Sequence, residues 1–290
     1  MGVALISLVI GPGASDADVA APLPEVQVKA PEVPAPAPCA TPWTSTHLVA
    51  TKGLLKASID IEAAVLDGDP ARAAARDLGA CPEIDGRLPD CTCLIRLESV
   101  TDAPFSSPRR TVAFVHPDHG SMQYESWQGH SHVRHRDCQG QRHSTRWKMK
   151  KGCDELVRER DRVASADAAK LPVVDGSSLA WFASARRLDR EGAKFMVAAW
   201  SGDVLVPVRL EAREIVALER RDQGPVDARR VSLEADSGEE EEEEASVAPF
   251  GLKGEVSLYL ELGTGRVLAL EGDSVKIGHI RATNADAGIR

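Results

Sequence analysis

The densest group of side chains capable of chemistry lies in GHSHVRHRDCQGQRH, which runs from Gly129 to His143. These fifteen positions hold four histidines, three arginines and one cysteine. Imidazole nitrogens and thiolates are preferred zinc ligands, and a structural zinc site needs four ligands that converge tetrahedrally. The segment therefore suggests a zinc-dependent protein or enzyme as one candidate function. The candidate ligands are His130, His132, His135 and Cys138.

The spacing and charge of the segment favour another interpretation. In a strand, His130 and His132 share one face while His135 points to the other. Arg134, Arg136 and Arg142 lie near these histidines and would repel a dication. We therefore expect an exposed polar strand face with its loop, and no cofactor, with zinc kept as the alternative.

The same region is basic. Residues 129–151 hold seven lysines or arginines against one acid, and Trp127 and Trp147 lie close to them. Clustered cations beside aromatic rings can bind anionic groups such as lipid headgroups or acidic glycans. An exported protein rarely meets nucleic acid, which is not an expected partner. The candidate anion-binding residues are Arg134, Arg136, Arg142, Arg146, Lys148, Lys150 and Lys151.

Motifs for nucleophilic catalysis are missing from the sequence. Ser177 and Ser178 lie in D-G-S-S-L, which does not match the G-x-S-x-G turn of serine hydrolases. Phosphate-binding and dinucleotide-binding glycine loops are also lacking. We expect the two serines to cap a helix, assign no catalytic residue, and expect a non-enzymatic protein.

The N-terminal region indicates export. The apolar run VALISLVI, Val3–Ile10, is followed by small residues, which predicts a signal peptide at residues 1–17. Residues 18–42 are rich in proline and alanine and should form a semi-rigid linker. No stretch is long and apolar enough for a transmembrane helix. We expect a periplasmic or secreted protein.

Six cysteines fit an oxidising compartment. Cys91 and Cys93 are two apart in an expected strand, so they share a face and should not bond each other. The pairings that close short loops are Cys81 with Cys91 or Cys93, and Cys138 with Cys153. These five cysteines are the disulfide candidates.

The elements that position these side chains are expected to be mainly strands. Residues 53–65 alternate between apolar and polar, and the C-terminal third repeats short strands with Gly or Asp turns. Helices are expected at 69–80, 153–163 and 175–188. We predict one β-rich domain over residues 43–290. Its expected form is a curved antiparallel sheet or a partly open barrel with two or three short helices.

One charge run dominates the net charge of −9. Glu239–Glu244 are six consecutive glutamates between two expected strands. Such runs repel themselves and stay solvated. The sequence thus predicts an acidic hairpin loop at residues 236–246.

Four stretches occur in a characteristic order: Asp175–Leu179, the strands from Trp200 to Glu211, the strand Val256–Leu260 with its return Arg266–Leu268, and Gly278–Ile280. On these stretches, the chain from about Leu54 to Arg281 resembles the domain-of-unknown-function family 3108. It implies an exported, β-rich bacterial protein without an assigned activity. It provides no catalytic residues.

Together these observations predict an exported cell-envelope β-domain that acts as a non-enzymatic binding or assembly module. A half-open barrel would leave a concave apolar face, so a lipid or another apolar ligand is one candidate occupant. Glycans and envelope proteins are other candidate partners. The alternatives are the zinc protein, centred on His130 to Cys138, and an anionic-surface binder, centred on Arg134 to Lys151.

Overall fold

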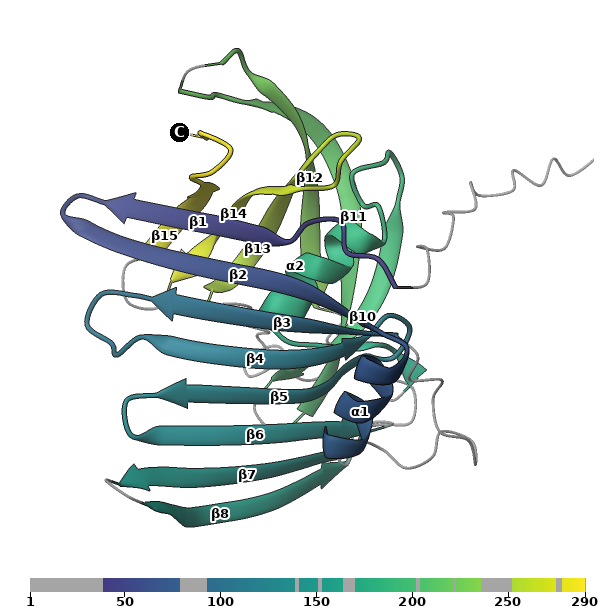
Figure 1. The fold of residues 1–290 in the computed structure, drawn as a ribbon. Helices are drawn as coiled ribbons and strands as arrows, with labels where there is room; N and C mark the ends of the chain where they lie inside the picture. Colours follow the sequence, from purple (N-terminus) through teal and green to yellow (C-terminus); the bar gives the residue numbers. More distant parts are fainter. Residues whose placement is uncertain are drawn as a thin grey trace, which may run out of the picture. The chain divides into compact units, whose positions relative to one another are not determined.

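The computed structural model describes residues 39–78, 93–138, 141–150, 153–163, 170–201, 204–221, 223–235, 252–274 and 278–289. These residues form fifteen strands and two helices (Figure 1). The strands are β1 (Ser45–Lys52), β2 (Leu55–Asp67), β3 (Cys93–Asp102), β4 (Arg109–His116), β5 (Gly120–Gln128), β6 (Ser131–Cys138), β7 (Gln141–Lys150), β8 (Cys153–Val163), β9 (Val173–Val174), β10 (Lys194–Ser201), β11 (Val204–Leu218), β12 (Val226–Ala235), β13 (Leu252–Glu261), β14 (Val267–Ser274) and β15 (Gly278–Asn284). The helices are α1 (Asp69–Leu78) and α2 (Gly176–Ala185). The prediction of mainly β structure is confirmed.

The sheet closes on itself as a barrel. Its strand order is β4-β3-β2-β1-β15-β14-β13-β12-β11-β10-β9-β5, and β5 pairs back onto β4 to complete a ring of twelve strands. The expectation of a curved sheet or partly open barrel is therefore confirmed in part, because the sheet is curved into a barrel but the barrel is closed. Closure depends on two pairings between strands that lie far apart in the sequence, β1 with β15 and β5 with β9.

The expectation of a purely antiparallel sheet is wrong at one strand. The short strand β9 runs parallel to both of its neighbours, β5 and β10. It bridges the gap between two antiparallel blocks. Because each parallel contact covers only one or two residue pairs, no sequence periodicity could reveal it.

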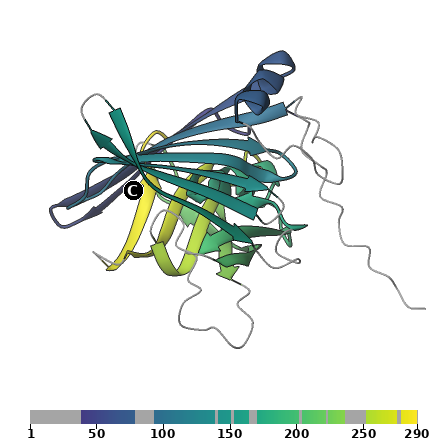
Figure 2. The same ribbon diagram turned by 90° about the horizontal axis from the view of Figure 1, so that it is seen from below.

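Helix α2 fills the interior of the barrel. It lies behind β1 and β2 and in front of β11 (Figure 1), and the purple-to-teal and green-to-yellow strands form two walls (Figure 2). The main core joins α2 to inward side chains of both walls, such as Ile95 and Leu258. Trp181 and Phe182 are the largest fully buried side chains.

The sequence of α2 explains this position. GSSLAWFASA is apolar or small on every side, and a helix of that kind is stable only when surrounded by protein. The helix is therefore buried on every side, with nine of its ten residues buried. Asp175 caps the helix and forms a capping box with Ser178, which satisfies amide groups that burial would otherwise leave unpaired. In the described part of the chain, no helix combines the length and apolarity of a membrane span.

Most elements agree with their sequence patterns. The expected strand at 53–65 corresponds to β2, and the helices at 69–80 and 175–188 correspond to α1 and α2. The helix expected at 153–163 is wrong, because these residues form β8. Pairing with β7 along its whole length outweighs the weak local helix preference of its charged residues.

The described disulfide differs from the expected pairings. Cys39 bonds Cys93, with the two Cα atoms 5.2 Å apart, so it ties the chain before β1 to the start of β3. The register places Cys138 and Cys153 at opposite ends of β7. Ten residues of strand span about 30 Å, too far for a disulfide. The proposed Cys138–Cys153 pairing is therefore wrong.

Several predictions concern residues outside the described part of the chain. These are the signal peptide at 1–17, residues 18–38 of the linker, the acidic loop at 236–246, and Cys81 and Cys91.

Candidate anion-binding surface

Strands β6, β7 and β8 continue the sheet from β5 without joining the ring. We call them the β6–β8 extension. Side chains alternate between the two faces of a strand, and directly opposite residues of an antiparallel pair share a face. The register therefore shows which candidate residues lie together.

One face of the extension is built around Ser144. Opposite residues on such a face lie about 5 Å apart and diagonal neighbours about 7–8 Å apart. Five arginines surround Ser144 on this face, which we call the arginine face. Its rows across β6, β7 and β8 are Val133–Arg146–Arg158, His135–Ser144–Arg160 and Asp137–Arg142–Arg162.

One of these arginines is neutralised. Asp137 is buried and accepts hydrogen bonds from Nε and Nη2 of Arg142, at 2.6 and 2.9 Å. The guanidinium of Arg142 also lies 4.6 Å from the ring centre of Trp200 on β10. Burial raises the pKa of Asp137, against the opposing pull of Arg142. This pair joins the arginine face to the barrel wall.

The other side of the face remains open to an anion. Arg146 and Arg158 are both exposed, and none of the ion pairs found among the described residues involves them. Lys148 and Lys150 lie further along the same strand and face, and Lys150 pairs with Glu155. The face thus carries more positive than negative side chains.

His135 lies within this cationic group. Its ring stacks on Tyr124 with the centres 5.7 Å apart, and its Nδ1 lies 2.7 Å from the Ser144 hydroxyl oxygen. Burial, together with the positive charges of Arg142, Arg162 and Arg146, lowers the pKa of His135 to about 3. The imidazole is therefore neutral at physiological pH, because burial and, to a lesser extent, the surrounding positive charges disfavour the protonated form.

The opposite face of the extension is filled by its own contacts. His132 stacks between Trp127 and Trp147, with ring centres 4.9 and 4.6 Å away. Glu125 binds both His132 and Arg134. The charged groups and aromatic rings named on this face therefore have partners on the same face. We call it the tryptophan face.

The zinc candidates are not brought together by this arrangement. His130 lies in the exposed turn before β6, and His132 and His135 lie on opposite faces of that strand. The Cys138 side chain lies outside the described part. Across the described ranges, no three His, Cys, Asp or Glu side chains form a group suited to a metal ion.

The predicted anion-binding residues divide between the two faces. Arg142, Arg146, Lys148 and Lys150 lie on the arginine face, while Arg134 and Arg136 belong to the tryptophan face. Lys151 lies outside the described residues. The sequence reasoning missed three arginines of β8, because that segment was expected to be helical. Their signal was the alternation R-E-R-D-R over residues 158–162.

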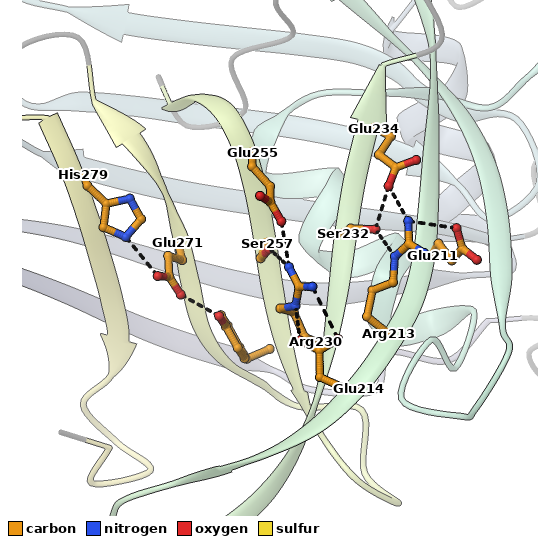
Figure 3. A network of polar contacts seen from close by, with 11 residues as sticks. Glu211, Arg213, Glu214, Arg230, Ser232, Glu234, Glu255, Ser257, Glu271 and His279 are labelled. Atoms are coloured by element: carbon orange, nitrogen blue, oxygen red, sulfur yellow. Dashed lines mark hydrogen bonds and ion pairs between the residues drawn. The ribbon is translucent and has the colours of Figure 1, made fainter.

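A second charged surface is different in kind. On the outside of β11–β15, Arg213, Arg230 and His279 each contact acidic side chains (Figure 3). Arg230 binds Glu214 and Glu255, while Arg213 contacts Glu211 and Glu234. These charges neutralise one another across the strands, which supports the sheet but leaves little net potential for a ligand.

A hydrogen-bonded chain completes this surface. The Tyr259 hydroxyl donates to Glu271 at 2.5 Å. Glu271 in turn lies 2.9 Å from Nε2 of His279 (Figure 3). Burial and the bond to Glu271 raise the pKa of Tyr259 to about 12. Bonds to Glu271 and Asp273 raise the pKa of His279.

Comparisons with protein-family models, with curated proteins and with solved structures give no match to this chain.

Proposed function

We propose that the protein is an exported, non-enzymatic binding domain that holds an anionic partner on the arginine face. The observation that carries this proposal is the ring of arginines around Ser144, of which Arg146 and Arg158 are exposed and outside the ion pairs of the described residues. Like charges packed at this spacing repel one another, so an anion bound there gains from all of them.

An apolar ligand in the barrel is less well supported. That idea rested on an open concave face, but the ring is closed and α2 occupies its interior with Trp181 and Phe182. The side chains of the protein itself therefore take the place that a lipid chain would need. The anionic partner becomes the leading hypothesis.

Export is supported by the Cys39–Cys93 disulfide, because such bonds persist mainly in oxidising compartments. The signal peptide and the resemblance to family 3108 remain predictions that point the same way. A non-enzymatic role agrees with the contacts of Ser178, whose hydroxyl caps α2 and accepts from Ser121.

Binding to a heparin matrix tests the proposal, because retention of a chain with net charge −9 requires a local basic surface. We expect retention at low salt that weakens as salt rises. The double variant Arg146→Gln/Arg158→Gln should lose most of it, since each surface cation contributes about 1 kcal/mol. Lys56→Gln/Arg190→Gln is the matched control, because it removes the same charge from exposed positions elsewhere. Passage of the wild-type protein without retention, or equal loss in both variants, would overturn the proposal.

A further inference from the structure

We propose that the outer edge of β8 receives an extended acidic segment of another protein as an added antiparallel strand. This inference rests on the proposed function and names the partner of the arginine face: a polypeptide with acidic residues at alternate positions.

The first observation is the free edge. Strand β8 is the last in the sheet order, and among the described strands it pairs only with β7. It is eleven residues long. A long edge presents a row of backbone donors and acceptors, which a partner strand can use in β-augmentation.

The second observation is a pair of exposed apolar side chains at a β-bulge on this edge. The register shifts from Arg146↔Arg158 to Trp147↔Leu156, so Val157 is the extra residue of a β-bulge. Leu156 is 53% and Val157 57% exposed. Two adjacent, large apolar side chains on an edge would be covered by an added strand.

The third observation is the charge pattern. Arg158, Arg160 and Arg162 project on the arginine face, and Glu159 and Asp161 project on the tryptophan face. Along any strand, alternate residues are about 6.6 Å apart. Alternate side chains of an added strand have the same spacing and would therefore lie opposite the three arginines.

This pattern disfavours a second copy of the chain. Opposite residues of an antiparallel pair share a face, so two β8 edges paired over residues 158–162 would place arginine opposite arginine. On the other face they would place Glu159 and Asp161 opposite acids. A partner with acids on the arginine face and neutral or basic residues on the other face makes favourable pairs throughout.

The test uses the full chain and short capped peptides with fluorescent labels. The probe has glutamate at every second position and threonine between. One control has the same composition with the glutamates in a block. A second control keeps the alternation but carries N-methyl groups on the amides that would face β8, which prevents strand pairing without altering charge. We expect the probe to bind about tenfold more tightly than either control.

A charge-swap pair adds specificity. Arg158→Glu should weaken binding of the alternating peptide, and a peptide with lysine at the facing position should restore it. Arg158 is exposed, so this variant should keep its fold, which circular dichroism can verify. Restoration would not follow from a general loss of positive charge.

The outcomes separate this inference from the proposed function. Equal binding of all three peptides, with heparin retention intact, would overturn strand addition and leave anion binding in place. If the wild-type protein binds neither the peptides nor heparin, both proposals are overturned. Light scattering that reports a dimer, strengthened by Arg158→Glu because the variant replaces an arginine–arginine pair with an opposite-charge pair, would assign the edge to a second copy and would overturn the inference.

Discussion

Asp137 accepts two hydrogen bonds from the Arg142 guanidinium and is itself buried, with its side chain 2% exposed. The pair has two roles, because it neutralises one arginine and fixes β6 to β7 beside the barrel wall. Removing only the carboxylate separates these roles.

We therefore expect Asp137→Asn to lower stability while it strengthens anion binding. Breaking a buried pair from one side costs about 3 kcal/mol, and the released charge of Arg142 adds to the arginine face. Urea unfolding and heparin elution give the two measurements. Asp161→Asn is the control, because it removes one charge from an exposed pair with His143 on the tryptophan face. If both variants change elution equally, the face assignment is wrong.

The chain from Tyr259 through Glu271 to His279 predicts how stability depends on pH. Hydrogen bonds to Glu271 and then to Asp273 raise the pKa of His279 above its ordinary value of 6.5. A raised folded-state pKa means that protonated His279 stabilises the folded protein below the ordinary value. This contribution is lost as pH rises through the folded-state pKa.

Unfolding free energies from about pH 5 to about pH 9 should therefore show a decline through the neutral range that His279→Asn reduces. Burial raises the pKa of Glu271, but the hydrogen bonds to Tyr259 and His279 lower it by more. The pKa of Glu271 is therefore below its ordinary value, and the carboxylate stays ionised in this range. Replacement of His47 is the control, because His47 pairs with Asp60 across different strands, β1 and β2. A wild-type profile that rises steadily with pH would contradict the prediction.

The sequence predicted best what depends on neighbouring residues. Alternation in residues 53–65 placed β2, and the run Asp69-Pro70 placed the start of α1, because these signals are local. Barrel closure could not be predicted, since it depends on the pairing of β1 with β15 and of β5 with β9, which lie far apart in the sequence. Strand β8 was missed because its charged sequence shows no alternation of apolar and polar residues. Its extended conformation depends on pairing with β7.

The candidate site was located only in part for the same reason. The histidine segment drew attention to β6, yet all the arginines and lysines assigned to the arginine face lie on β7 and β8. Which face a residue occupies depends on register, and register is a property of paired strands. The bond from Cys39 to Cys93, across 54 positions, likewise reflects the fold and not the shortest loop.

That disulfide predicts a large effect on stability. Closing a loop of 54 residues restricts the unfolded chain, and the chain-entropy relation gives about 4 kcal/mol. We expect Cys39→Ser and Cys93→Ser each to lower the unfolding free energy by a similar amount. The double variant should lose no more than either single variant, because the bond is already absent. Additive losses would mean that the two sulfurs act separately, and peptide mapping of the non-reduced protein provides an independent measurement.

The buried position of Trp181 predicts how a cavity inside the barrel would change stability and ligand binding. Its side chain is 1% exposed inside the wall, and its replacement by alanine should cost about 3–5 kcal/mol. Because the lining is apolar, the cavity should stay dry and accept a small apolar molecule, so benzene should raise the melting temperature of Trp181→Ala and leave the wild-type protein unchanged. Trp147→Ala, on the tryptophan face, removes the same side chain from a half-buried position and should gain no such response. A wild-type protein that is stabilised by benzene to the same extent would show that the interior retains room beside α2, and would restore an apolar ligand as the leading hypothesis.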